Sequence, residues 1–465
     1  MMILDSKIAL SLLAILPVAL GELEPHRARS RRHHGHTPRP REVDIDISIS
    51  LGGNPESSSK PRFPYGEKMV RGVNLGGWLV LEPWITPSLF DGTGKTTIID
   101  EYTFGQFQDK AVAKAKLVKH WNTWITEPDF AAIAAAGLNH VRIPIGYWAF
   151  DTSAGEPYVS GQYPYLQKAV KWAKVHGLKV LIDLHGAPGS QNGFDNSGRA
   201  GNTTWHLDQK NVDRTNAIIK KLAKEFSQDK HKDTVTAIAP LNEPASFRDD
   251  KVLPVTRQYW KDSYQNIRYP TGDVKKPGPL IEVIHDAFQP LSSWDGFLTK
   301  PEATGVAMDT HHYEVFSDGE VARSFDEHIQ SVCDFGINTV GSYASKNLPT
   351  VVGEWSNAMT DCAKYLNGRP NGARYDGTFT GSTKVGDCGP KTGSGLDFTD
   401  EYKTELRKFW EAQATAYEYG KLGWIFWTWK AEIAAEWSYQ AGLAGGWIPK
   451  NPEERKYPGI CGKGQ

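Results

Sequence analysis

Two glutamates in this sequence each close an apolar run that has the composition of a buried strand. Glu243 ends the stretch IAPLNE, and Glu354 ends the stretch VVGE. An isolated glutamate usually forms a surface ion pair, but a carboxylate directly after a buried strand is unlike that case. Two carboxyl groups facing one cavity can hydrolyse an acetal, because one protonates the leaving oxygen while the other faces the anomeric carbon. The proton donor needs a pKa that burial or a nearby negative charge has raised.

The elements that would position these glutamates alternate between strand and helix patterns. Eight short apolar or β-branched runs predict strands at residues 69–75, 140–145, 179–184, 235–241, 280–284, 305–310, 350–353 and 424–428. Helical spacing between them is clearest at residues 128–136, 165–176 and 402–419, each followed by glycine. Eight such repeats predict an α/β fold, a (β/α)8 TIM barrel with enlarged loops on its catalytic face. A doubly wound open sheet is the alternative, but no G-x-G-x-x-G motif follows the first strand.

Polar or aromatic side chains stand at the end of almost every predicted strand. They are Asn74, Arg142, Asp183, His185, Asn242, Glu243, His285, Asp286, His311, Tyr313, Glu354 and Trp427. In a (β/α)8 barrel the carboxyl ends of all strands meet at one face, where catalytic residues lie. The sequence therefore predicts one active site built from several strands.

The first 64 residues differ in composition from the rest. Residues 8–20 are apolar and precede small residues suited to signal-peptidase cleavage, so residues 1–21 are interpreted as a signal peptide; a membrane anchor is the alternative. Residues 22–64 are basic and rich in Pro, Ser and His, which predicts a disordered linker or pro-segment. The pair Arg31 and Arg32 is a candidate processing site, and residues 65–465 form the expected catalytic barrel.

Composition excludes several classes of protein. With 53 basic and 54 acidic side chains the formal net charge is −1, which argues against a nucleic-acid-binding surface. No internal run reaches the ~20 apolar residues of a membrane helix, so we expect no membrane association after signal cleavage. Four cysteines in a secreted chain predict two disulfides, for which three pairings are open, and no C-x-x-C pair suggests zinc. We expect no cofactor and no metal, and Asn202 opens a glycosylation sequon.

Seven ordered motifs resemble those of glycoside hydrolase family 5 and, within it, the fungal exo-1,3-β-glucanases. They are RGVNLGGWLVLEPWITPSLF (71–90), HVRIPIGYW (140–148), DLHGAPGSQNGFDNSG (183–198), LNEP (241–244), HHYEVF (311–316), GEW (353–355) and FWTWK (426–430). The resemblance covers residues 65–465. It implies a retaining enzyme that releases glucose from the nonreducing ends of 1,3-β-glucans by double displacement, with Glu243 as acid/base and Glu354 as nucleophile. Some 1,6-β activity and transglycosylation are compatible with it.

The resemblance also implies roles for ten substrate-binding residues. Asn242 would bind the sugar 2-OH, and Arg142 would pair with Glu354 and keep it anionic, whereas the motif of Glu243 contains no such cation. The nonreducing glucose would lie among His185, His311 and Tyr313, above Trp427, with Glu82 and Asp195 closing the pocket. Phe194 and Phe316 would clamp the next sugar at the entrance. Trp437 is a candidate platform for a more distant sugar.

The same resemblance implies disulfides Cys333–Cys461 and Cys362–Cys388, and a monomer secreted to the medium or the cell wall, where it acts on β-glucan. Two alternatives stay open. One is a β-1,6-glucanase, endo-glucanase or transglycosylating variant with the same carboxylates; a pocket closed by Glu82 and Asp195 favours exo attack. The other is a cell-wall protein that only binds glucan, which would be expected to lack one of the two glutamates.

Overall fold

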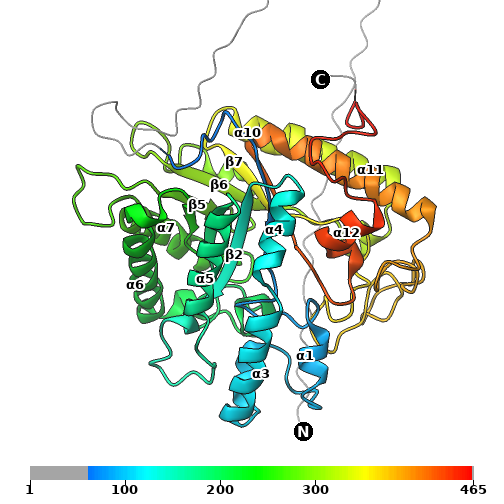
Figure 1. Ribbon diagram of the computed structural model, residues 1–465, viewed down its shortest axis with the longest axis horizontal. Coiled ribbons are helices and arrows are strands. Elements are labelled where there is room, and N and C mark those ends of the chain that lie inside the picture. The colour runs from blue at the N-terminus through cyan, green and yellow to red at the C-terminus, as the bar shows by residue number, and fades with distance from the viewer. Residues whose placement is uncertain (1–60, 463–465) are drawn as a thin grey trace, which may run out of the picture. The chain divides into compact units, whose positions relative to one another are not determined.

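A closed barrel of eight parallel strands forms the centre of the computed structural model, which describes residues 61–462 (Figure 1). Each strand pairs with the next one in sequence, and β8 pairs with β1. The strands are β1 (Val70–Asn74), β2 (His140–Gly146), β3 (Lys179–Gly186), β4 (Val235–Ala239), β5 (Ile281–His285), β6 (Val306–His311), β7 (Thr350–Glu354) and β8 (Lys421–Phe426). The predicted (β/α)8 barrel is confirmed.

Helices surround this barrel. The longer ones are α3 (Lys110–Thr123), α4 (Glu127–Ala135), α5 (Tyr163–Val175), α6 (Gln209–Phe226), α7 (Val252–Arg268), α9 (Phe325–Asp334) and α11 (Asp400–Ala416). The shorter ones are α1 (Pro87–Asp91), α2 (Glu101–Gln106), α8 (Asp318–Val321), α10 (Ser342–Ala344) and α12 (Tyr439–Gly445). In Figure 1, α4, α5 and α7 flank the strands; α5 packs on β2 and β3, and α7 packs on β5. Between β5 and β6 a single 3₁₀ turn, Leu291–Trp294, replaces the helix.

Some predicted boundaries differ from the observed ones for physical reasons. β4 ends at Ala239, two residues before the predicted end, because Pro240 has no N–H to continue the ladder. β8 begins at Lys421 and ends at Phe426, so Trp427 lies just beyond the strand, where its N–H donates to Trp355 O. Helix α11 ends at Ala416 and continues as a 3₁₀ turn before β8.

The inner face of the barrel changes from apolar to polar along the strands. Side chains alternate between the two faces of a strand, so every second residue points inward. One end of the interior is filled by apolar side chains, among them Leu181 of β3 and Ala307 of β6. Two residues further along the same strands come Asp183 and Asp309, both buried. The sequence thus packs an apolar plug beneath a polar layer at the carboxyl ends.

The described chain begins by closing the apolar end of the barrel. Phe63 is buried among the inward-facing apolar residues. Arg62 donates to five backbone carbonyls, including Phe226 O at 2.7 Å and Val235 O at 2.9 Å. The packed part of the chain therefore starts slightly before residue 65. The predicted signal peptide and nearly all of the basic segment lie outside the described residues.

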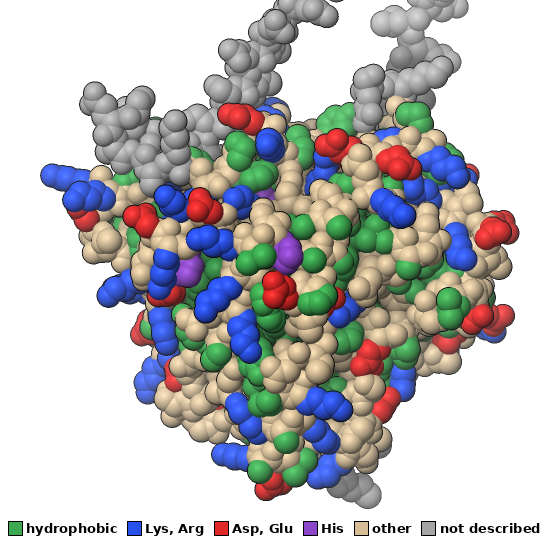
Figure 2. Space-filling view, in the orientation of Figure 1, with side chains coloured by type: hydrophobic (Ala, Val, Ile, Leu, Met, Phe, Trp, Pro, Cys, Tyr) green, Lys and Arg blue, Asp and Glu red, His purple; other side chains and the backbone are tan. Residues whose placement is uncertain are grey.

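Two disulfides join distant parts of the chain, Cys333–Cys461 and Cys362–Cys388, as the family resemblance implied. The first ties the C-terminal residues to α9, and the second closes part of the long loop between β7 and α11. Among residues 61–462 we find no helix with the length and apolar character needed to span a membrane. Basic and acidic side chains are interspersed over the face shown in Figure 2.

Candidate active site

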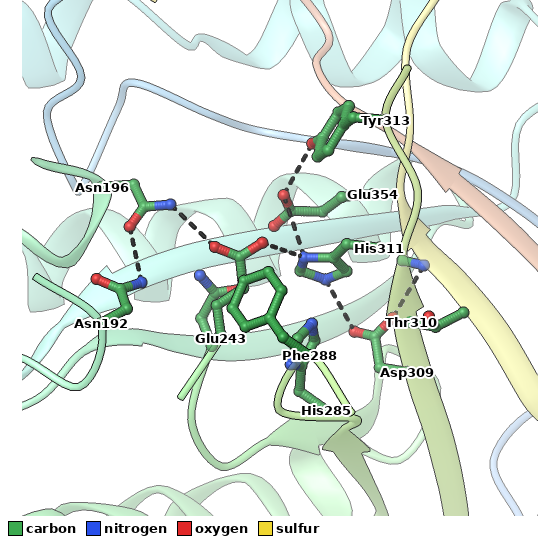
Figure 3. A network of polar contacts seen from close by, with 12 residues as sticks. Asn192, Asn196, Glu243, His285, Phe288, Asp309, Thr310, His311, Tyr313 and Glu354 are labelled. Atoms are coloured by element: carbon green, nitrogen blue, oxygen red, sulfur yellow. Dashed lines mark hydrogen bonds and ion pairs between the residues drawn. The ribbon is translucent and has the colours of Figure 1, made fainter. Parts of the chain in front are cut away.

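The two predicted catalytic glutamates meet at one histidine. Glu243 follows β4, Glu354 ends β7, and His311 ends β6. The Nδ1 atom of His311 lies 2.7 Å from Glu243 Oε1 and 3.5 Å from Glu354 Oε2 (Figure 3). Tyr313 adds a hydrogen bond from its hydroxyl to Glu354 Oε2 at 2.9 Å. Both carboxyl groups are therefore brought to a single point at the polar end of the barrel.

Arg142 forms the buried base of this arrangement. Its Nη1 donates to Glu354 Oε1 at 2.7 Å and to Asn74 Oδ1 at 3.0 Å, and its Nη2 donates to Asn242 Oδ1 at 2.8 Å. Asp183 lies 3.2 Å from the same guanidinium. The expected pairing of Arg142 with Glu354 is thus present, and the arginine also orients Asn242.

The charges on the two carboxyls differ from the sequence-based expectation. Burial acts to raise the pKa of Glu243, but the hydrogen bond and the charge of His311 outweigh burial and lower this pKa to about 2. Burial raises the pKa of Glu354, although His311 and Arg142 act against it. The expectation of a raised pKa for Glu243 is therefore wrong for the free protein, because Glu243 has a cationic partner, His311, outside its own motif. A sequence motif shows only neighbours along the chain, whereas His311 reaches Glu243 from another strand.

The proton nearest to Glu243 is held by His311. Burial acts to lower the pKa of His311, but Glu354 and Asp309 raise it well above its ordinary value. Asp309 Oδ2 lies 3.5 Å from His311 Nε2, on the other side of the ring. Asp309 Oδ1 in turn accepts the N–H of Gly353 at 2.9 Å. A Cβ at position 353 would collide with this carboxylate, which explains the glycine before Glu354.

The loop that carries Glu243 is fixed by a glutamine that sequence reasoning missed. Glu243 has a positive φ of 49°, a left-handed conformation that side chains other than glycine rarely adopt. Buried Gln191 holds the loop by donating to Asn242 O at 2.8 Å and to His185 O at 2.9 Å. Asn196, also missed, donates to Glu243 Oε2 at 3.1 Å. Both residues lie in loops, where no periodic pattern marks a functional side chain.

A cavity of about 760 Å³ opens above the two glutamates. Of the twelve predicted site residues, nine line it: Glu82, Phe194, Asp195, Glu243, His311, Tyr313, Phe316, Glu354 and Trp427. The other three, Arg142, His185 and Asn242, are buried beneath the residues that line the cavity. Arg142 contacts Glu354 and Asn242, as described above. His185 stacks on Trp427, with ring centroids 5.5 Å apart. Long-loop residues such as Asn371 and Arg374 also line the cavity.

Several buried polar atoms around the cavity have no hydrogen-bond partner within the described chain. They are Glu82 Oε1, Asp195 Oδ2, His185 Nε2 and Asn242 Nδ2. Burial and the charge of Asp195 raise the pKa of Glu82, and burial together with Asp100 raises the pKa of Asp195 to about 7. Unpaired buried donors and acceptors cost free energy, so these atoms are suited to a ligand rich in hydroxyl groups.

Two groups of aromatic rings line the cavity. Phe316 lies near Tyr313 and Trp437, with centroids 5.6 and 6.5 Å away. Phe194 lies 6.4 Å from Phe247. Phe247 and Phe288 also line the cavity but were not predicted from sequence, and Trp437, the candidate platform, does line it. Flat apolar rings of this kind can stack on the C–H face of a pyranose.

Glu243, His285 and His311 are close enough to suggest a metal site, with ligand atoms within 4.8 Å of one another. The tautomer of His285 argues against it. Its Nδ1 accepts the N–H of Ala287 at 3.0 Å, so Nε2 must carry the proton of the neutral ring. Neither nitrogen of His285 then has a free lone pair for a cation, and we assign no metal to the cluster.

An eight-stranded barrel with one glutamate after β4 and one at the end of β7, beneath a cavity lined by aromatic rings and carboxylates, defines a glycoside hydrolase. Residues 105–369 match the Cellulase family, glycosyl hydrolase family 5, and the chain belongs to this family.

Individual proteins that are similar to this chain agree with the family assignment. The chain is 48% identical over 402 residues to the probable glucan 1,3-beta-glucosidase A of Aspergillus niger, covering 86% of this chain and 92% of the relative. It is 46% identical over 408 residues to the glucan 1,3-beta-glucosidase of Blumeria graminis, covering 87% and 92%. Among solved structures, rutinosidase from Aspergillus niger shares the fold, with a TM-score of 0.63, 20% identity, and coverage of 82% of this chain and 98% of that one.

Proposed function

We propose that the protein is a retaining exo-1,3-β-glucanase that removes glucose from the nonreducing ends of 1,3-β-glucans. The observation that carries the proposal is the contact of Glu243 and Glu354 with one nitrogen of His311. Because both oxygens lie close to that atom, their separation is at most about 6 Å, which is below the roughly 6.5–9.5 Å of most inverting enzymes and compatible with the roughly 5–5.5 Å of retaining ones. The glucan 1,3-beta-glucosidases among the relatives support the substrate class.

In the first step Glu354 attacks the anomeric carbon as the carboxylate. The bond from that carbon to the glycosidic oxygen breaks, and its electron pair goes to the oxygen, which takes a proton from Glu243. The raised pKa of His311 keeps it protonated in the free enzyme, and its Nδ1 lies 2.7 Å from Glu243 Oε1, so transfer across this hydrogen bond supplies the acid. Bound substrate excludes water from the site. Without water the neutral pair of Glu243 and His311 costs less free energy than the ion pair, which favours the proton transfer.

In the second step Glu243, now ionised, removes a proton from a water molecule. The resulting oxygen attacks the anomeric carbon and displaces Glu354, so the product has the configuration of the substrate. Asn242 Nδ2 is buried and has no hydrogen-bond partner among residues 61–462, which supports a role in donating to a sugar hydroxyl beside Glu354. Arg142 and Tyr313 donate to Glu354 and stabilise it as a leaving carboxylate.

Exo action is supported by the carboxyl groups of Glu82 and Asp195. Each lines the cavity and has one buried oxygen with no hydrogen-bond partner in the part of the chain that the structure describes. Such oxygens can accept hydrogen bonds from the hydroxyls of a terminal glucose, and a chain continuing past that glucose would leave them unpaired. Trp427, parallel to His185, offers a flat apolar surface for the same sugar.

The products formed from laminarin test this assignment. We expect glucose alone from the earliest time points, and no product from a Glu354→Gln variant prepared in parallel. A mixture of oligosaccharides as primary products would show endo action and contradict the proposal.

We further propose that the enzyme is a secreted monomer that acts on cell-wall β-glucan. The apolar segment at residues 8–20, the two disulfides and the exposed sequon at Asn202 support secretion. Mass spectrometry of the secreted protein tests these points, because it reports the new N-terminus and any glycan at Asn202. A chain that begins at residue 1 in the membrane fraction would contradict the proposal.

A further inference from the structure

Three phenylalanines form a cluster on the cavity wall, each in a loop after a different strand. Phe194 follows β3, Phe247 follows β4 and Phe288 follows β5. The ring centroids of Phe247 and Phe288 are 5.3 Å apart, and Phe194 lies 6.4 Å from Phe247 and 6.5 Å from Phe288. We call these residues the phenylalanine cluster. All three line the cavity that contains the two glutamates.

Phe247 is the most exposed ring of the cluster. It is 61% exposed, and Phe288 is 40% exposed. Large apolar side chains gathered in an exposed patch at a cavity usually mark a place where a ligand covers them. Arg248 lies over the ring of Phe194, with its guanidinium carbon 4.9 Å from the centroid. The same guanidinium carbon lies 5.9 Å from the centroid of Phe247, yet this ring stays largely exposed and open to a ligand.

The loops that carry the cluster are fastened to one another. The N–H of Ala245 donates to Gln191 O at 3.0 Å, which joins the β4 loop to the β3 loop. The hydroxyl of Ser246 donates to Ala287 O, which joins the β4 loop to the β5 loop. Phe247 is therefore held on fixed backbone, and a ligand would not have to order it on binding.

The cluster lies on the side of the site where the leaving chain must pass. Phe247 follows Glu243 by four residues, and the ring of Phe288 lies 5.4 Å from that of His285, which has a ring nitrogen within 4.8 Å of a Glu243 oxygen (Figure 3). Glu243, as the acid/base, must lie beside the glycosidic oxygen. Residues adjacent to Glu243 therefore face the sugar chain that leaves when the bond is cleaved. Trp427 and Glu82 belong instead to the pocket for the terminal glucose.

We propose that Phe247 is a specificity-determining residue that binds glucosyl units of the leaving chain beyond the one next to the cleaved bond. This inference rests on the proposed function and adds a preference for longer substrates to it. The occupant is a β-glucan chain, because the cluster is continuous with the catalytic cavity and because its apolar rings suit the C–H faces of glucose.

Kinetics with oligosaccharides of increasing length test this role. The values of kcat/KM are measured for laminaribiose, whose leaving group is a single glucose, and for laminaritriose and laminaritetraose, which reach further. In Phe247→Ala we expect the ratio of kcat/KM for laminaritetraose to that for laminaribiose to fall about two- to tenfold. Phe247→Tyr keeps an aromatic ring and should keep the ratio of the wild type.

Phe107→Ala is the matched control, because Phe107 is 40% exposed and does not line the cavity. Its ratio should equal that of the wild type, and melting temperatures show whether each variant is folded. If Phe247→Ala cleaves all lengths with the ratio of the wild type, the inference is wrong while the proposed function stands. If the wild-type enzyme cleaves none of these oligosaccharides, both the proposed function and this inference are wrong.

Discussion

The Nδ1 atom of His311 contacts both Glu243, at 2.7 Å, and Glu354, at 3.5 Å. The proposed acid/base and the proposed nucleophile therefore share one cation, and neither carboxyl has an ionisation independent of the other. Asp309, on the far side of the ring, helps to keep His311 protonated. The charges of Glu243, after β4, and Glu354, on β7, therefore depend on His311, which lies on β6.

Replacing His311 should shift the pH dependence of activity. Burial raises the pKa of Glu354 while His311 and Arg142 lower it, so His311→Asn should raise this pKa further. The nucleophile must be ionised, and the acidic limb of kcat/KM should therefore move to higher pH, by about one unit or more. The control is His312→Asn, since His312 hydrogen-bonds to Tyr417 and stacks on Phe335. An acidic limb at the same pH in His311→Asn and wild type would show that His311 does not control Glu354.

The two catalytic glutamates should respond differently to isosteric replacement. Glu354→Gln removes the nucleophile and should lower kcat on every substrate by about 10⁵-fold or more. Glu243→Gln should lower cleavage of laminarin about 10²–10⁴-fold, yet it should still form the covalent intermediate from an aryl glucoside with a good leaving group. A burst of released phenol in stopped-flow measurements detects that step. Identical behaviour of the two variants on the activated substrate would contradict the assigned roles.

The contribution of Asp195 should depend on pH. Burial and the charge of Asp100 raise the pKa of Asp195 to about 7, so it is mostly protonated below that pH and ionised above it. Asn in its place resembles the neutral form. The loss of kcat/KM in Asp195→Asn should therefore be small near pH 5 and grow as the pH rises through 7, because the ionised acceptor binds sugar hydroxyls more strongly. A loss that is constant from pH 5 to 8 would mean that the ionisation of Asp195 does not affect binding.

The apolar end of the barrel should affect stability without affecting chemistry. Phe63 is 6% exposed, and Phe63→Ala should lower the free energy of unfolding by about 3 kcal/mol. Thermal unfolding checks this expectation, with the exposed residue Phe107→Ala as control. Since Phe63 packs at the end of the barrel opposite the carboxylates, kcat/KM at 25 °C should stay at the wild-type value. An unchanged melting temperature would show that this plug does not stabilise the fold.

The barrel and the meeting of Glu243 and Glu354 at one face could be predicted because their signals are local. Strand patterns ending in Glu243 and Glu354 place both carboxyls at one face once eight repeats close, and the family resemblance implied the pairing of Arg142 with Glu354. The end of β4 was also readable, since Pro240 cannot donate to the ladder, although the predicted strand ran past it.

The remaining features depend on contacts between distant segments. Alternation along β6 points His311 inward but cannot show that it touches Glu243, and so the charge of the acid/base was predicted wrongly. Gln191 and Phe247 lie in loops without any period that would reveal them. The basic, proline-rich composition around Phe63 indicated a linker, but the ring of Phe63 and the guanidinium of Arg62 attach residues 62 and 63 to the barrel.

The central claim is that Glu243 and Glu354 perform a double displacement, and the anomeric form of the first product tests it most directly. Proton NMR of the glucose released from laminari-oligosaccharides, recorded before mutarotation, distinguishes the two outcomes. The account predicts β-glucose first, with the α-anomer appearing only as the sugar equilibrates. Release of α-glucose first would mean a single displacement by water and would contradict the account.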